Sequence, residues 1–200
     1  QNFSQVTNPP IDSLRENKVM SLKTRFGNLG NILDFDNLTE DNIYVLDSPI
    51  LTNSQFKKFK KFFSKKIKVI DCTFDIEGSL RERIRLIREE AETAVREGST
   101  CLVLSDKNIS SQKASIPSIL TVGAVHSHLV KHGLRGYCSL NVECSDAMDT
   151  HSFAILIGVG ATTVNPYLAI DSIYQRFEKK LFGKSDFETC VSKFKKSIDA

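Results

Sequence analysis

The chain has 200 residues, of which 40% are hydrophobic and 26% are charged, and its formal net charge is +3 at pH 7. That length supports one sizeable hydrophobic core or at most two small ones, and the composition is ordinary for a globular domain. No apolar run approaches the roughly 20 residues of a membrane-spanning helix. A net charge this small points to no particular partner, so neither nucleic acid nor a membrane surface is expected.

The first 50 residues are expected to be irregular. Residues that interrupt any long periodicity are spread along this segment, namely Pro9, Pro10, Gly27 and Gly30. A short helix is expected to begin near Asp12. The chain starts at Gln1 and has no basic stretch followed by an apolar run, as a signal peptide would. We therefore expect a piece of a longer protein, with an irregular segment at 1–50 and an α/β core at 51–200.

From residue 51 onward, strands and helices are expected to alternate. The clearest helix is 79–98, where apolar residues recur at spacings of three and four along one face. Ser79 and Glu82 predict a capping box at its start, and Gly98 is placed to end it. Short β-rich or apolar runs predict strands at 67–72, 100–104, 137–142 and 162–165.

Further helices are expected between and after these strands. They cover 117–132, 150–157 with Thr150 as its cap, 166–181, and a last helix that begins near Ser185 or Asp186. For 153–157 a strand is the competing interpretation, and periodicity does not separate the two. Strand, helix, strand, helix at this spacing indicates an α/β fold with crossover helices and a mainly parallel sheet. An open doubly wound sheet and a partial (β/α) barrel-like sheet both fit, and we prefer the latter.

Five cysteines, an odd number, are spread along the chain without any CxxC pair. Cys72, Cys101 and Cys138 lie in apolar, strand-like runs, where a reduced cysteine behaves as a small hydrophobic residue. A reducing, cytoplasm-like compartment fits this usage best. A disulfide framework or a cysteine-ligated cluster within the chain is not expected.

Seven lysines crowd the segment 55–68, and a nucleic-acid or membrane-binding patch is one interpretation of them. However, Phe56, Phe59, Phe62 and Phe63 interleave with the lysines at helical spacing. An amphipathic helix that packs its phenylalanines inward and exposes its lysines explains the segment better.

His126, His128 and His132 lie close together and suggest a metal site. On a helix, residues 128 and 132 share one face while 126 points elsewhere. The neighbouring sequence offers no acidic or cysteine partner. Partly buried or interfacial histidines are therefore the preferred interpretation, and no metal is expected.

Five acidic residues lie near the carboxyl ends of the predicted strands, the edge where parallel α/β folds place active sites. They are Asp71, Asp75, Glu77, Asp106 and Glu143. One hypothesis is a free-standing α/β small-molecule-binding enzyme that uses these acids, although helix capping and solubility explain them equally well. The Gly158–Val159–Gly160 turn lacks the rest of any phosphate-binding motif, and a helix end explains it.

Several segments, in this order, resemble a known family. They are QVTNPPIDSLRE (5–16), VMSLKTRFGNLGN (19–31), SPILTN (48–53), IDCTF (70–74), SIPSILTVGAVHSHLVKHGLR (115–135) and HSFAILIGVGATTVNPYLA (151–169). Together they resemble the central domain of the glutamate synthase large subunit over nearly the whole chain. The amino-acid sequences of segments 21–31 and 155–169 look closest to those of the bacterial NADPH-dependent type.

The resemblance implies a segment of a large oxidoreductase that makes two L-glutamate from L-glutamine and 2-oxoglutarate. Its neighbours in the polypeptide would be a glutamine amidotransferase domain and an FMN-binding synthase domain. The whole enzyme would use FMN and a 3Fe-4S cluster, neither of them bound by this segment. An NADPH-dependent type would add a small subunit with FAD and 4Fe-4S clusters, whereas the other type would receive electrons from ferredoxin. A bacterial cytoplasmic location is implied, with the plastid stroma as the alternative.

The family's central domain is expected to be non-catalytic, to connect the two active sites and to line part of an ammonia tunnel. A tunnel for a small neutral molecule needs modestly polar, tightly packed walls. Thr7 and Asn8, beside Pro9 and Pro10, suit that role, as does Thr24. The organisation of turns explains the same residues as well.

Overall fold

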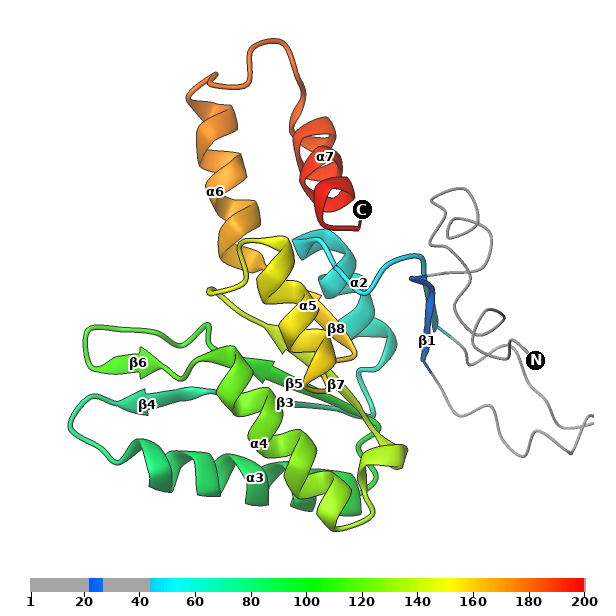
Figure 1. The fold of residues 1–200 in the computed structure, drawn as a ribbon, viewed down its shortest axis with the longest axis vertical. Helices are drawn as coiled ribbons and strands as arrows, with labels where there is room; N and C mark the ends of the chain where they lie inside the picture. The colour runs from blue at the N-terminus through cyan, green and yellow to red at the C-terminus, as the bar shows by residue number, and fades with distance from the viewer. Residues whose placement is uncertain (1–21, 27–43, 200) are drawn as a thin grey trace, which may run out of the picture.

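A four-stranded parallel sheet lies at the centre of the computed structural model, which describes residues 22–26 and 44–199. Its strands are β3 (Ile67–Asp71), β5 (Cys101–Ser105), β7 (Ser139–Glu143) and β8 (Thr163–Asn165), and they pair in the order β3-β5-β7-β8. Strands that follow one another in the sequence therefore lie side by side (Figure 1). Every pair is parallel, so each connection must cross over the sheet.

Three crossover helices cover one face of this sheet. They are α3 (Leu80–Arg96), α4 (Ser118–Lys131) and α5 (Thr150–Gly158), and all three place apolar residues in one core cluster with the strands. A doubly wound sheet would carry its crossover helices on both faces. The sequential strand order, and the placement of all three crossover helices on one face, confirm the predicted barrel-like α/β sheet.

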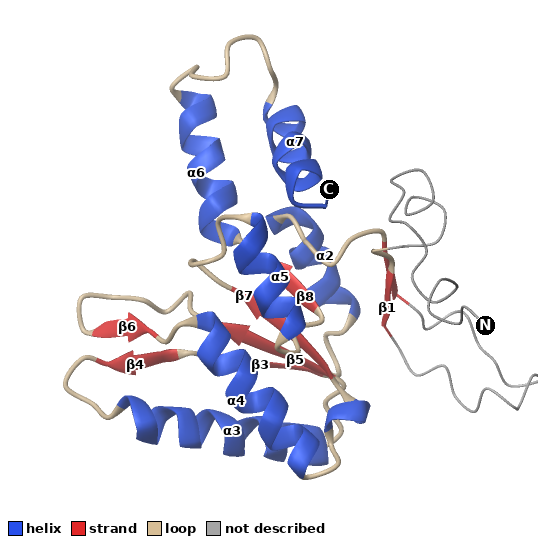
Figure 2. Ribbon diagram, in the orientation of Figure 1, coloured by secondary structure: helices blue, strands red, loops and turns tan. Residues whose placement is uncertain are grey.

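The opposite face is covered by α2 (Asn53–Phe62) and by the antiparallel pair β1 (Thr24–Phe26) and β2 (Tyr44–Leu46) (Figure 2). The β5 side chains alternate between the two faces, because successive residues of a strand point to opposite sides. Leu102 and Leu104 pack toward α3 and α4, whereas Cys101 and Val103 pack toward α2. Every residue of β5 is therefore buried.

Helix α2 confirms the amphipathic interpretation of the lysine-rich segment. Phe56 and Phe59 are 1% and 0% exposed, and most of the lysines around them are exposed. Phe62 and Phe63 depart from the expectation, because Phe62 is 48% exposed and Phe63 is the half-buried C-cap that follows the helix. A capping box between Thr52 and Gln55 begins the helix. Lys60 is the exception among the lysines, because it is half-buried and pairs with Glu143.

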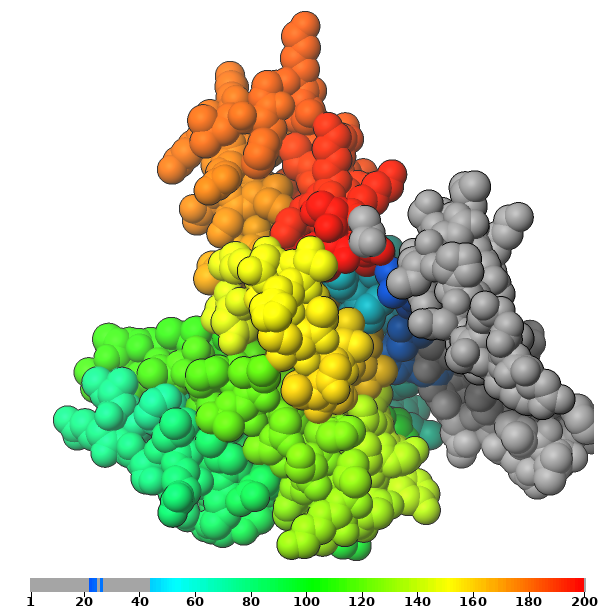
Figure 3. All heavy atoms as spheres, in the orientation of Figure 1, coloured from blue at the N-terminus to red at the C-terminus, as the bar shows by residue number. Residues whose placement is uncertain are grey.

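Helices α6 (Tyr167–Glu178) and α7 (Phe187–Asp199) pack on each other and project from the body of the molecule (Figure 3). The end of α7 returns toward the start of α2, where the Ser48 hydroxyl donates to Asp199 Oδ1 at 2.7 Å. A second projection is the antiparallel pair β4 (Thr73–Asp75) and β6 (Lys113–Ser115). The remaining element, η4 (Arg135–Tyr137), is a short 3-10 turn just before β7.

The structure corrects several details of the sequence-based expectations. Strands β1 and β2 lie within the segment expected to be irregular, and β4 and β6 were not predicted. Residues 150–158 form a helix and not a strand, and its cap is Asp149, whose carboxylate accepts from the Ser152 N–H, in place of Thr150. The short helix expected near Asp12 lies outside the described residues.

All five cysteines are free. Four of them are buried, and burial raises the pKa of the Cys72 and Cys101 thiols to about 12. Thiols held protonated in this way are poor nucleophiles and poor metal ligands. Within 22–26 and 44–199, none of the helices combines the length and the apolar character that a membrane crossing requires.

Candidate functional site

All four strands of the parallel sheet end on a polar residue. The strand register aligns Asp71, Ser105, Glu143 and Asn165 in one row across the sheet, on the face toward α2. Their side chains share a face because they occupy matching positions in adjacent parallel strands. This row lies at the carboxyl edge, where parallel α/β folds usually bind ligands. It is therefore the first place to look for chemistry.

Glu143 is the centre of this row. Its carboxylate, 4% exposed, lies 3.2 Å from Lys60 Nζ and 3.0 Å from Lys107 Nζ, and it accepts from the Ser105 hydroxyl at 2.8 Å. Burial alone would raise the pKa of Glu143, but the hydrogen bonds and the two ammonium charges hold it below its usual value. The group is therefore a fixed anion whose partners already satisfy it.

The other members of the row are also satisfied by neighbours. Asn165 Nδ2 donates to Leu51 O at 2.9 Å and to Asn53 Oδ1 at 3.0 Å. Asp71 accepts from the Thr73 N–H and hydroxyl and from Asn108 Nδ2. Burial opposes ionisation of Asp71, yet these hydrogen bonds leave its pKa lowered. Such a network organises the sheet edge and leaves no free acid or base within it.

Of the five acids predicted at this edge, the structure brings two into the row and a third beside it. Asp106 is 3% exposed and accepts from the Ser145 N–H at 2.9 Å and hydroxyl at 2.6 Å, while its Oδ1 atom has no hydrogen-bond partner among the described residues. Asp75 and Glu77 are instead exposed on the β4–β6 projection. Asp71 and Glu143 thus lie at the strand ends as expected, but on β3 and β7 with β5 between them, so they do not form one acid cluster.

The amino end of β7 carries a charged residue that sequence reasoning missed. The Arg135 guanidinium donates to Cys138 O, to Gly160 O at 2.9 Å and to Thr162 Oγ1 at 3.3 Å. Its Nε–H donates to His126 Nδ1 at 3.2 Å. Burial and the Arg135 charge lower the pKa of His126. Arg135, in η4, thus connects α4, the residue before β7 and the loop between α5 and β8. Its acceptors are neutral, so no acidic partner in the sequence indicated this role.

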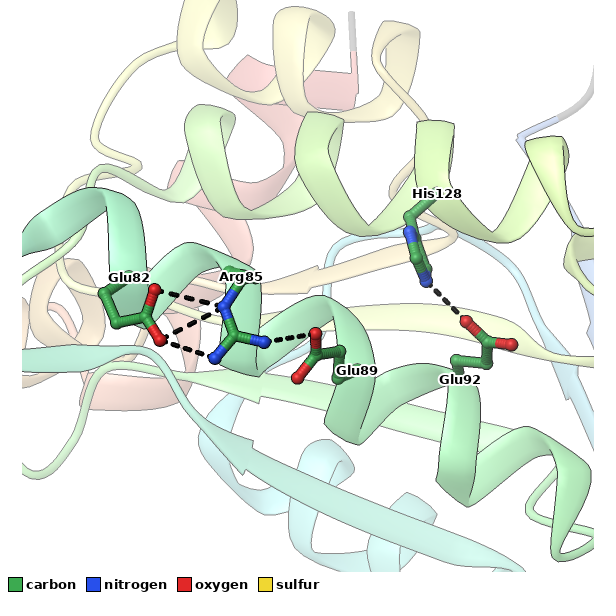
Figure 4. A network of polar contacts seen from close by, with 5 residues as sticks. All are labelled: Glu82, Arg85, Glu89, Glu92 and His128. Carbon is green, nitrogen blue, oxygen red and sulfur yellow. Dashed lines mark hydrogen bonds and ion pairs between the residues drawn. The ribbon is translucent and has the colours of Figure 1, made fainter.

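The histidines behave as the helix geometry predicted, but they have a partner that the sequence did not reveal. His126 points toward Arg135, while His128 and His132 lie together on the α3 side of α4, with ring centroids 4.3 Å apart. Glu92 of α3 stands beside them, and His128 Nε2–H donates to its Oε2 at 2.7 Å (Figure 4). The acidic partner that the local sequence lacked is thus supplied 36 residues away.

These three side chains are the group among the described residues with the geometry to hold a metal ion, since their ligand atoms all lie within 4.8 Å of one another. The two histidines border a cavity of about 350 Å³ between α3 and α4, which Arg85, Arg88 and Lys131 also line. Sequence reasoning found the histidine pair but had no signal for Glu92, because the two helices meet only in the folded chain.

The described structure does not test the prediction of three tunnel residues. Thr7 and Asn8 lie outside the described residues. Thr24 begins β1, opposite Leu46 of β2, and its hydroxyl donates to Leu22 O at 3.3 Å. The Gly158–Val159–Gly160 turn ends α5 and enters β8, as expected of a helix end.

Comparison with known proteins gives a consistent result over the whole chain. The family described as glutamate synthase central domain matches residues 1–200. The large chain of the glutamate synthase [NADPH] of Azospirillum brasilense is 51% identical over 202 residues, which cover 100% of this chain and 13% of that protein. The corresponding large chain of Bacillus subtilis (strain 168) is 39% identical over 206 residues, which cover 99% of this chain and 13% of that protein. The chloroplastic ferredoxin-dependent glutamate synthase of Spinacia oleracea is 41% identical over 181 residues, which cover 88% of this chain and 11% of that protein.

Proposed function

This chain belongs to the glutamate synthase central domain family, and from that membership we propose that it is the connecting domain of a larger glutamate synthase polypeptide. The observation that carries the proposal is the match over residues 1–200, together with the 13% share of the Azospirillum brasilense protein that the chain spans. A glutamine amidotransferase domain and an FMN-binding synthase domain would flank it in the same polypeptide. The chain would hold these two active sites in a fixed relation.

The whole enzyme would form two L-glutamate from L-glutamine, 2-oxoglutarate and reducing equivalents, with FMN and a 3Fe-4S cluster outside this segment. The higher identity to the Azospirillum brasilense NADPH protein, 51% against 41% for the Spinacia oleracea ferredoxin protein, favours NADPH as electron donor. In that case a small subunit carries FAD and 4Fe-4S clusters. A bacterial cytoplasmic location goes with this assignment.

The sheet edge supports a structural role. In many parallel α/β enzymes this edge holds the reacting groups. Here Glu143 is paired with two lysines and a serine, and Asn165 is bonded to backbone and side-chain groups of the segment before α2. An edge whose polar groups are mutually bonded stiffens the domain, which is what a connector between two active sites requires. The same bonds weigh against the alternative of a free-standing small-molecule enzyme.

The tunnel part of the proposal is tested in the full-length enzyme by changing Thr7→Val, Asn8→Ala and Thr24→Val. Each substitution removes a polar group that suits a path for ammonia. The expected result is glutamine hydrolysis in excess of glutamate formation, because ammonia then escapes before it reaches 2-oxoglutarate. The ratio of the two half-reactions is the measurement, and Thr93→Val on the exposed face of α3 is the matched control.

Two outcomes separate the parts of this proposal. An unchanged ratio in all three variants would remove these residues from the ammonia path while leaving the connecting role intact. Stabilisation of the 200-residue chain by glutamine, 2-oxoglutarate or FMN would instead contradict the connecting role, since a domain without a substrate site gains nothing from them.

A further inference from the structure

The groove between α3 and α4 combines three side chains that the connecting role does not use. His128 and His132 are one helical turn apart on α4, so their rings lie on the same face. Glu92 reaches His128 from the neighbouring helix α3 (Figure 4), and its Oε2 atom also faces His132. Two imidazoles and one carboxylate from two packed helices form a typical ligand set for a transition metal.

His132 is already oriented as a ligand. Its Nδ1–H donates to the backbone carbonyl of His128 at 2.8 Å, which leaves the lone pair of Nε2 free. That Nε2 atom lies 4.0 Å from Glu92 Oε2. Metal-binding histidines usually donate their other ring N–H to a carbonyl or carboxylate in this way, because the bond fixes the tautomer and the ring orientation.

Glu92 presents one of its two oxygen atoms to the histidines. Arg96 Nη2 holds Oε1 at 2.8 Å, while Oε2 faces both His128 and His132. Arg96 Nε–H donates to the same Oε1 atom at 2.9 Å, so Oε2 is the oxygen that remains to face the two imidazoles. A metal ion would replace the proton that now joins His128 to Glu92.

We propose that Glu92, His128 and His132 bind a divalent transition-metal ion of the zinc type across the α3–α4 groove. Three protein ligands with a water in the fourth position are a common arrangement for Zn²⁺, and the cavity beside them has room for that water. The ion would join α3 to α4. This proposal is independent of the role assigned to the chain in glutamate synthase.

The surroundings select against hard cations. Mg²⁺ or Ca²⁺ prefers a set of roughly six or more oxygen ligands. The side-chain oxygens that line this cavity belong to Glu89, which is paired with Arg85, and to Ser127, while Arg85 and Lys131 add positive charge. The Arg85 charge is compensated by Glu82 and Glu89, both of which it contacts on α3 (Figure 4). Nitrogen ligands therefore determine which ion binds, and they favour Zn²⁺, Ni²⁺ and Cu²⁺ over Mg²⁺.

Titration of Zn²⁺ alone into the 200-residue chain, with a colorimetric chelator as competitor, tests the site. All proteins carry Cys190→Ser, which removes the cysteine that is not buried. We expect one Zn²⁺ per chain, with an affinity that falls about tenfold or more in His132→Ala and in Glu92→Gln. His151→Ala, which removes an exposed histidine on α5, is the matched control and is expected to bind as the parent does.

Nuclear magnetic resonance of the four histidine rings gives a second measurement that does not depend on affinity. Zn²⁺ is expected to shift the ring signals of His128 and His132 and to leave those of His126 and His151 in place, while Mg²⁺ shifts none. Absence of Zn²⁺ binding would overturn the proposal and leave an ordinary hydrogen-bonded His–Glu pair. Equal binding by the parent, His132→Ala and Glu92→Gln would overturn it too, as would movement of the His126 and His151 signals alone.

Discussion

The two ends of strand β7 are each tied to their surroundings by one charged side chain, but the partners differ in kind. At the carboxyl end, the Glu143 carboxylate has two lysine ammonium groups and a hydroxyl as partners. Just before the amino end, the Arg135 guanidinium donates to two backbone carbonyls, a hydroxyl and a histidine ring. One end is held by opposite charges, and the other by a cation that neutral acceptors surround.

This difference determines how each end responds to substitution. When the acid of an ion pair with partly exposed lysines is removed, water solvates the lysines again. This solvation offsets part of the free energy lost with the ion pair. The half-buried carbonyls of Cys138 and Gly160 have less access to water that could replace a lost guanidinium. The amino end is therefore expected to be the more sensitive of the two, although it carries none of the acids that drew attention to the sheet.

Gly160→Ala is expected to cause the largest loss, about 3 kcal/mol or more in the free energy of unfolding. Gly160 has φ +122°, and a Cβ atom there would lie 2.3 Å from His126 Nδ1. Backbone strain and overpacking each cost about 1–3 kcal/mol. Urea unfolding followed by circular dichroism measures the change. Gly123→Ala, in α4 where an added Cβ meets nothing within 4 Å, is the control and is expected to stabilise by about 0.5–1 kcal/mol.

Arg135→Met is expected to destabilise the chain by about 2–3 kcal/mol, because hydrogen bonds from a charged donor are lost together. Arg135→Lys is expected to recover less than half of that loss, since an ammonium lacks the planar fork that reaches Cys138 O and Gly160 O at once. The same unfolding experiment measures both variants. Full recovery by lysine would mean that charge alone, and not the fork, holds the amino end.

Glu143→Gln is expected to cost about 1–2 kcal/mol, less than either change at the amino end. The amide keeps an acceptor for the Ser105 hydroxyl but loses the pairing with Lys60 and Lys107, whose side chains are 32% and 47% exposed. Glu82→Gln, at an exposed carboxylate on α3, is the control and should leave the unfolding midpoint unchanged. A loss larger than that of Arg135→Met would reverse the ranking of the two ends.

The smallest effect is expected in the pH dependence of stability. The pKa of Glu143 is lowered from 4.5 in the folded chain, so unfolded chains bind more protons just below that value. The stabilising contribution of Glu143 is therefore complete above about pH 4.5 and is lost as the pH falls through the folded pKa. The free energy of unfolding, measured with urea at several pH values between 7 and 3, should decrease less steeply with falling pH for Glu143→Gln than for the parent. An equal pH dependence in the two proteins would show that other acidic residues determine the loss of stability at low pH.

The sequence predicted the regular part of the fold well, because hydrophobic periodicity reports local structure that tertiary packing then preserves. The four central strands and the helix with the Phe56 and Phe59 stripe are examples. Strands β1, β2, β4 and β6 each have three residues and exist only through their pairing partners. Three residues are too few for any period to be visible. Strand β8 is equally short, and it was predicted because it lies between two predicted helices.

The sites were harder to predict than the fold, for a physical reason. Glu143 was visible as an acid at a strand end, whereas its lysine partners came from a helix and a loop far away in the sequence. Arg135 uses carbonyl groups, which every residue has, so no residue type marks its role. Glu92 joins His128 only because two amphipathic helices pack side by side. Contacts between elements depend on the assembled layers and are not encoded locally.

The segment before α2 has a consequence for the order in which the chain folds. Ile50 forms a parallel bridge with Val164, and Asn165 donates to Leu51 O, so the segment completes the edge of a sheet whose nearest strand lies 114 residues later. These bonds to β8 can form only after residues 163–165 have joined the growing chain, whereas Phe56 and Phe59 of α2 pack against Cys101 and Val103 of the earlier strand β5. Contacts between residues so far apart in the sequence slow folding. The interval before β8 is made, when the backbone groups of this segment lack their sheet partners, is when a chaperone would have most to protect.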